Sequence, residues 1–229
     1  VCQDGFITSH AVENIELESD EMVKNFVGEY HPENYLLKHE NPLAVGPYGV
    51  SPYYMEAKMG QVQAMKNAKK VILEVGKRFG DETGRYYGFF ESYQLEDADS
   101  AIVIIGSSAG TARAAVDELR ARGRKVGMLK VRVFRPFPFD EIAEALSGVK
   151  AVAVMDKAES FSAAGGPLFA ETRSALYDLE SRPKAINYVY GLGGRDFRVE
   201  DCVTIFDQLD EIIATGKTGE VYRHIGQRG

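Results

Sequence analysis

Four glycine- or proline-rich turns contain the residues of this sequence that could bind a ligand or a partner. Each follows a short apolar run: GSSAGTAR at 106–113, VFRPFPFDE at 133–141, DKAESFSAAGGPLFAE at 156–171 and YGLGGRD at 190–196. Ligands of parallel sheets bind beyond the carboxyl ends of the strands, so a site is expected in these turns. Each turn can hold an anion, cap a helix or contact a partner.

The first turn, GSSAGTAR, places serines and a threonine where a helix is predicted to begin. Free backbone amides and the helix dipole at such a position could hold an anion. A serine or threonine there is also an ordinary helix cap. The turn lacks both the Walker spacing with its lysine and a full GxGxxG, so phosphate binding is the weaker interpretation.

The second turn, VFRPFPFDE, is stiffened by Pro136 and Pro138 on either side of Phe137, and Arg135 leads out of the preceding run. Proline fixes its own backbone, and Pro138 can also start a helix. The phenylalanines could simply plug the edge of the domain. The pattern favours an interface over a catalytic role, with Arg135 and Phe137 as the candidate residues.

The third and fourth turns carry charged residues beside glycines. Asp156 ends the run before the third turn and could be a ligand or an acid, or equally a cap or an ion-pair partner. In YGLGGRD the glycines permit positive φ, and the Arg–Asp sequence suggests a charged pair held near the main chain. Phosphate binding and subunit docking fit this turn equally well. Its candidate residues are Gly193, Gly194, Arg195 and Asp196.

The elements that position these turns alternate regularly from about residue 98. Apolar runs at 100–106, 125–132, 150–156 and 184–191 alternate with helical segments that begin near residues 111, 138, 166 and 199. Continuous apolar strands separated by helices predict an α/β fold, a parallel sheet with helices on both faces. Upstream, apolar residues at helical spacing predict one long amphipathic helix over 55–80.

Composition excludes several classes of function. The 229 residues are 45% apolar with a net charge of −7, so the chain is globular and lacks the basic surface that nucleic acid requires. No apolar run reaches the roughly 18 residues of a membrane span. Cys2 and Cys202 form no disulfide framework, so we expect a reducing, cytoplasmic location. The start at Val1 suggests a processed product or a fragment.

No motif in the sequence is sufficient for catalysis. The histidines lack metal-ligand spacing such as HExxH, and no GxSxG elbow marks a serine nucleophile. We therefore predict no metal site and no catalytic residue in this chain. The residues alone indicate a soluble α/β domain with charged turns.

Several longer segments resemble a known family. They are DGFITSH (4–10), GPYGVSPYYMEA, EAKMGQVQAMKNA, GRYYGFFESYQLEDAD (84–99), GSSAGTARAAVDELRARGRKVGMLKVRVFRPFP and YVYGLGGRD. Together they resemble the α-type chain of pyruvate:ferredoxin oxidoreductase and related 2-oxoacid:ferredoxin oxidoreductases, over nearly the whole chain. The FRPFP turn followed by the GLGGRD turn is the more specific part of the likeness.

The resemblance implies a fold and a function. Residues 1–50 would be the tail of the pyrimidine-side thiamine domain, 51–97 a connector with the long helix, and 98–229 a domain like the C-terminal one of transketolase. The complex would decarboxylate a 2-oxoacid, most simply pyruvate, on thiamine diphosphate with Mg²⁺. Electrons would leave through 4Fe–4S clusters to ferredoxin, and the acyl group would pass to coenzyme A. Beta, gamma and delta subunits would be partners.

The family's cofactor-activating and substrate-binding residues lie upstream of DGFITSH, and the sequence also lacks a GDG segment and a CxxCxxC run. We therefore expect no cofactor bound by this chain alone, an inactive isolated chain, and a role for GLGGRD in an interface rather than a diphosphate cradle. The alternatives are a stand-alone α/β domain that binds a small acidic ligand and, within the family, oxalate or another 2-oxoacid as substrate.

Overall fold

The computed structural model describes residues 1–44, 46, 48–161 and 164–228. Contacts divide the chain into two compact units. The sheet unit consists of Val1–Ala11 and Tyr87–Gly229, and the helix unit of Val12–Tyr86. Ser162 and Ala163 of the third turn lie outside the described residues.

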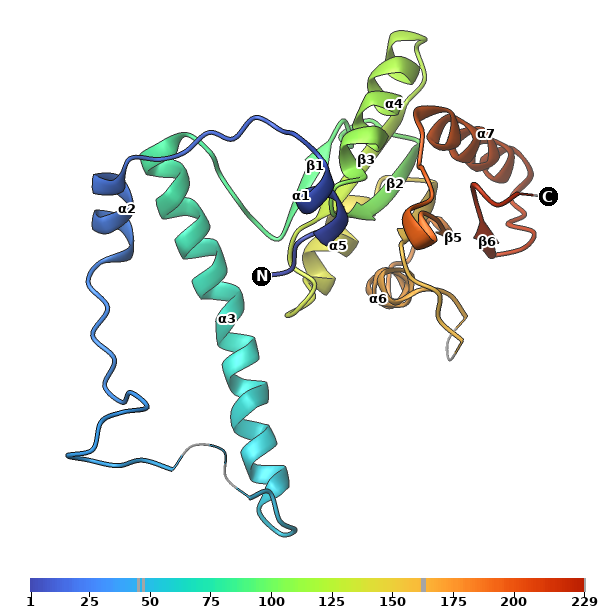
Figure 1. Ribbon diagram of the computed structural model, residues 1–229. Coiled ribbons are helices and arrows are strands. Elements are labelled where there is room, and N and C mark those ends of the chain that lie inside the picture. The colour runs from blue at the N-terminus through green and yellow to red at the C-terminus, as the bar shows by residue number, and fades with distance from the viewer. Residues whose placement is uncertain (45, 47, 162–163, 229) are drawn as a thin grey trace. The chain divides into compact units, whose positions relative to one another are not determined.

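The sheet unit contains one six-stranded sheet in the order β1-β3-β2-β4-β5-β6 (Figure 1). The four predicted runs are confirmed as parallel strands. β6 extends the parallel set, whereas β1 pairs antiparallel with β3 at the opposite edge. The strands are β1 (Phe90–Tyr93), β2 (Ser100–Ile105), β3 (Val126–Val131), β4 (Ala151–Asp156), β5 (Lys184–Val189) and β6 (Tyr222–His224).

Two helices cover each face of the sheet, as the sequence predicts for this fold class (Figure 1). The cluster with α4 (Ala109–Ala121) and α7 (Val199–Thr215) includes Ile102 and Ile104 of β2. The cluster with α5 (Phe139–Leu146) and α6 (Pro167–Leu176) includes the alternate residue Val103. Both faces of the central strands are therefore buried, which explains their continuous apolar sequence.

The strand order creates a switch point at the carboxyl ends of β2 and β4. The chain leaves β2 for its neighbour β3 and then returns to pair β4 on the other side of β2. The crossovers on the two sides of β2 therefore run in opposite directions, which opens a crevice in doubly wound sheets. The turns after β2 and β4, which begin at Gly106 and Lys157, meet there.

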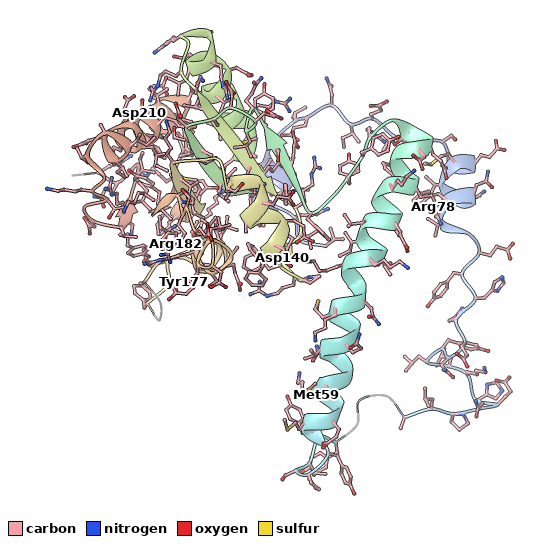
Figure 2. All side chains as sticks on the ribbon, turned by 180° about the vertical axis from the view of Figure 1, so that it is seen from behind. Met59, Arg78, Asp140, Tyr177, Arg182 and Asp210 are labelled. Atoms are coloured by element: carbon pink, nitrogen blue, oxygen red, sulfur yellow. The ribbon has the colours of Figure 1, made fainter. Side chains whose placement is uncertain are left out.

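The helix unit is built around α3 (Tyr54–Thr83), which confirms the long helix predicted over 55–80. The shorter α2 (Asp20–Val27) is capped by Ser19, whose Oγ accepts a hydrogen bond from the Met22 amide at 3.2 Å. Near one end of α3, the Arg78 guanidinium lies 4.0 Å from the centre of the Phe26 ring and donates to the Phe26 carbonyl (Figure 2). This contact fastens α2 to α3.

The predicted apolar face of α3 is exposed within the helix unit. Met55, Met59 and Val62 are 73%, 55% and 43% exposed, while the residues that α3 buries are Gly76 and Gly80. Nothing in the helices described here is long and apolar enough to cross a membrane. Among the described residues of the helix unit, α2 packs near Phe79, whereas the stretch of the apolar face from Met55 to Val62 is left uncovered.

Candidate functional site

The switch point contains a carboxylate that the chain itself supplies. Helix α1 (Gly5–His10) belongs to the sheet unit, and its N-cap residue is Asp4. Asp4 Oδ2 accepts a hydrogen bond from Ser107 Oγ at 2.6 Å and lies 3.4 Å from Lys157 Nζ. The hydrogen bond from Ser107 is the main cause that lowers the pKa of Asp4. The turns after β2 and β4 therefore hold an anion that comes from residue 4.

The GSSAGTAR turn makes a contact that neither interpretation of its sequence included. Ser108 is the N-cap residue of α4 and makes no capping hydrogen bond with its side chain. Ser107 instead donates to Asp4, 103 residues away in sequence. The charged group that this structure places at the turn is the carboxylate of Asp4.

The buried Asp156 is a structural cap. Its Oδ1 accepts from the Leu168 amide at 2.8 Å, and its Oδ2 accepts from the Phe169 amide at 3.1 Å and from Asn187 Nδ2 at 2.9 Å. Burial raises the pKa of Asp156, and these hydrogen bonds oppose the rise. A Cβ on Gly166 would lie 2.2 Å from Asp156 Cγ, so glycine is required there. Both carboxylate oxygens therefore accept hydrogen bonds from backbone amides in the first turn of α6.

The VFRPFPFDE turn packs its central ring inward. Phe137 is 5% exposed, and its ring centre lies 6.0 Å from Phe134 and 5.0 Å from Phe139. Arg135 stays at the surface, where its guanidinium lies 4.3 Å from the centre of the Phe134 ring and pairs with Glu171. The outer surface of this turn is therefore formed by Arg135 and Phe139, with Phe137 as internal support.

The YGLGGRD turn has the backbone that its glycines predict. Gly191, Gly193 and Gly194 have φ of +65°, +63° and +79°. Arg195 and Asp196 are exposed, and Asp196 Oδ2 lies 3.8 Å from Arg198 Nη2. The predicted Arg–Asp pair is thus replaced by one between Asp196 and Arg198. Across the described part of the chain, the Arg195 guanidinium has no hydrogen bond or ion pair.

A pocket of ≈120 Å³ opens between this turn and the segment after β6. His224 lines it, and its Nε2 lies 2.8 Å from Glu159 Oε2. Tyr222 donates to the other oxygen of Glu159, and this hydrogen bond is the main cause that lowers the pKa of Glu159. The pocket is lined by Val189, Tyr190, Gly191, Leu192, Arg195, His224, Ile225, Gly226 and Gln227.

The Glu159–Tyr222–His224 cluster was absent from the sequence predictions. Glu159 follows β4, whereas the other two residues belong to β6, more than sixty positions away. Only the pairing of β6 with β5 brings them together. A strand of three residues leaves too short a pattern to reveal this in the sequence.

The pocket beside YGLGGRD is too small for thiamine diphosphate. The described residues contain no group of three or more His, Cys, Asp or Glu side chains placed to hold a metal. Lys157 and Ser107 already contact Asp4, and a pocket of ≈120 Å³ is below the range of about 300–1,000 Å³ typical for cofactors. The geometry instead suits contact with one small acidic group.

Comparison with known proteins gives two family matches. Residues 98–202 match pyruvate:ferredoxin oxidoreductase core domain II. Residues 1–77 match the thiamine-diphosphate-binding domain of pyruvate flavodoxin/ferredoxin oxidoreductases. The two matches together include residues of both units of the chain.

Similar curated proteins agree with these matches. The chain is 45% identical over 98% of its length to pyruvate synthase subunit PorA of Thermotoga maritima and 39% identical over 92% to that of Methanocaldococcus jannaschii. It is 41% identical over 95% to ketoisovalerate oxidoreductase subunit VorA of Pyrococcus abyssi. It spans 56%, 54% and 55% of these relatives. The chain belongs to the family of α subunits of pyruvate and other 2-oxoacid:ferredoxin oxidoreductases.

Proposed function

We propose that this chain is an α-type subunit, or part of one, in a multisubunit 2-oxoacid:ferredoxin oxidoreductase of the cytoplasm. The reaction would be oxidative decarboxylation of a 2-oxoacid, most simply pyruvate, to acyl-coenzyme A with electrons passed to ferredoxin. The identity of 45% over 225 residues with a pyruvate synthase subunit carries this proposal. Because the chain spans about half of that relative, the activity belongs to the assembled enzyme.

Within the complex, this chain would serve assembly and support of the site. Residues 1–50 would end the thiamine domain, 51–97 connect it to the next, and 98–229 form the transketolase-like domain. The exposed apolar side chains of the helix unit support this role, since they would be covered in an assembly. The isolated chain would be inactive.

The cofactors would lie in the assembled enzyme. Thiamine diphosphate would supply the carbanion-stabilising chemistry, with Mg²⁺ at its diphosphate and 4Fe–4S clusters for electron transfer. Beta, gamma and delta subunits would complete the enzyme. Ferredoxin would accept the electrons and coenzyme A the acyl group in the complete enzyme. Arg135, Gly193, Gly194, Arg195 and Asp196 would contact neighbouring subunits, with Phe137 bracing the first of these turns from inside.

A second candidate is a stand-alone domain that binds a small acidic ligand. The pocket beside Arg195, together with the unpaired guanidinium of that residue, favours it. This candidate requires a stable monomer whose function needs no other subunit. The exposed apolar side chains of α3 instead favour the first candidate, a subunit of a complex.

Affinity capture of the tagged chain from native lysate tests the two candidates. Material that co-purifies would be assayed for thiamine diphosphate, iron and acid-labile sulfide, and for viologen dye reduction that depends on coenzyme A and a 2-oxoacid. We expect all three cofactors and activity with pyruvate. Parallel assays with ketoisovalerate, 2-oxoglutarate and oxalate identify the preferred substrate. Recovery of the chain alone and cofactor-free would contradict the complex.

A further inference from the structure

We infer that the pocket beside YGLGGRD receives an acidic side chain from a neighbouring subunit and that Arg195 pairs with its carboxylate. This inference rests on the proposed function, because it specifies the chemistry of the partner surface. The occupant is an Asp or Glu side chain of another subunit, at the position where the turn meets that subunit.

The first observation is the unpaired charge of Arg195. Most arginines near this end of the sheet unit have partners: Arg135 pairs with Glu171, Arg198 with Asp196, and Arg223 donates to Gln208. The Arg195 guanidinium has none among the described residues. In a chain of net charge −7, an arginine without an acidic partner is available for an incoming anion.

The second observation is that Arg195 is held in place. A Cβ on Gly226 would lie 3.5 Å from Arg195 Cγ, so the aliphatic part of Arg195 runs close to the backbone after β6. The Arg195 amide also donates to the Leu192 carbonyl at 3.2 Å. An arginine whose stem and backbone are held loses less conformational freedom when it forms an ion pair.

The third observation is the shape and lining of the pocket. Buried Val189 and exposed Leu192 provide apolar walls, and the imidazole of His224 is occupied by Glu159 at 2.8 Å. Arg195 is therefore the cation that remains for an incoming charge. The volume of ≈120 Å³ suits a carboxylate on a short hydrocarbon stem, which is the form of an acidic side chain.

The position of the pocket favours a protein side chain over a free metabolite. The turn that forms one wall is exposed from Leu192 to Asp196, so a protein surface can lie against it while one side chain enters the pocket. A free acid of this size would gain one ion pair and a small apolar contact, which gives weak binding. An acid fixed in a docked surface gains the same contacts without a separate binding step.

The test uses the complex captured from native lysate, with wild type, Arg195→Ala and Arg195→Lys chains compared. Arg198→Ala and Arg198→Lys are matched controls in the same segment, because Arg198 does not line the pocket. Removing one partner of a desolvated charge pair weakens binding strongly. We expect Arg195→Ala to weaken association about tenfold or more. Arg198→Ala should change it less than about twofold.

The Arg195→Lys chain also identifies the partner residue. Its amine keeps the positive charge and reacts with a nearby carboxylate through a zero-length carbodiimide cross-linker. We expect mass spectrometry to find an amide link between residue 195 and an Asp or Glu of another subunit, and no such link for Arg198→Lys. Links only to acids of the same chain would overturn the inference.

The remaining outcomes distinguish a failure of the Arg195 inference from a failure of the proposed function. Equal association of wild type and Arg195→Ala would overturn the inference and leave the proposed function standing. A wild-type chain that captures no other subunit would overturn both. Butyrate serves as a probe for a free acid. If butyrate shifts NMR signals of the pocket in an Arg195-dependent way while association is unaffected, the occupant is a small molecule and the inference is wrong.

Discussion

The two units of the chain differ in how they bury apolar side chains. In the sheet unit, every residue of β4 is buried, and the central strands pack under helices on both faces. In the helix unit, α3 runs for 30 residues and buries two glycines. Burial of one large apolar side chain is worth about 1.5–3 kcal/mol. The sheet unit therefore has a core of its own, whereas the described residues of the helix unit leave much of the apolar face of α3 exposed.

The two family matches fall on units that differ in burial. Residues 98–202, in the sheet unit, match a core domain. Residues 1–77 match a thiamine-binding domain, yet most of them lie in the helix unit, where apolar side chains face outward. A family match reports common ancestry of the sequence. The burial of apolar side chains indicates which part of the chain can be stable on its own.

The largest expected effect is a difference in stability between the units. Phe206 is fully buried in α7, whereas Met65 on α3 is 40% exposed. Phe206→Ala should lower the free energy of unfolding by about 3–5 kcal/mol. Met65→Ala should lower it by less than about 1 kcal/mol. Denaturant unfolding followed by circular dichroism measures both. Equal losses would remove the distinction between the units.

Next in size is the effect of the buried cap in the sheet unit. Asp156→Ala leaves the Leu168 and Phe169 amides without their acceptor and removes one of the two acceptors of Asn187 Nδ2. We expect a loss of about 3 kcal/mol in the free energy of unfolding. The control is Asp140→Ala in the first turn of α5, an exposed acid that should change stability by less than about 1 kcal/mol. A smaller loss for Asp156→Ala than for the control would contradict a structural role for Asp156.

Substitutions on the exposed face of α3 should weaken association with other subunits without changing the free energy of unfolding of the free chain. Met55→Gln combined with Met59→Gln keeps the helix propensity of α3 but removes two exposed apolar side chains (Figure 2). We expect unchanged unfolding of the free chain and roughly tenfold weaker capture of other subunits. Gln61→Ala, on the opposite side of α3, is the control. Unchanged capture would show that this face of α3 contacts no partner.

The smallest expected effect concerns the contact of α1 with the switch point. Asp4→Asn removes the charge that pairs with Lys157 and weakens the hydrogen bond from Ser107. We expect a stability loss of about 1 kcal/mol and faster hydrogen exchange in α1. Because the pKa of Asp4 is lowered, the wild-type contact is complete above pH 3.8 and is lost as pH falls through the lowered pKa. Unchanged exchange in α1 would show that Asp4 does not hold it.

The sequence predicted the central sheet because both faces of its strands are apolar. It missed β1 and β6, which have four and three residues, lie at the sheet edges and include polar side chains. The capping residues Asp4 and Ser19 are recognisable signals that could have located α1 and α2. Short edge strands and helices of one or two turns depend on tertiary contacts more than on local pattern.

The candidate site was predictable only in part. The positive φ of the YGLGGRD glycines follows from residue type, and Asp156 was named with capping among its possible roles. The contacts of Asp4 with Ser107, and of Glu159 with His224, join residues far apart in sequence. Chemistry that depends on which turns meet at a sheet edge requires the strand order, which local patterns do not specify.

The most direct test of the central distinction is hydrogen–deuterium exchange of the free chain and of the chain within its purified complex. The account predicts that β2, β3, β4 and β5 are protected in both states. Residues 54–75 of α3 should exchange quickly in the free chain and become strongly protected in the complex. Equal protection of α3 in the two states would contradict the proposal that other subunits cover this helix.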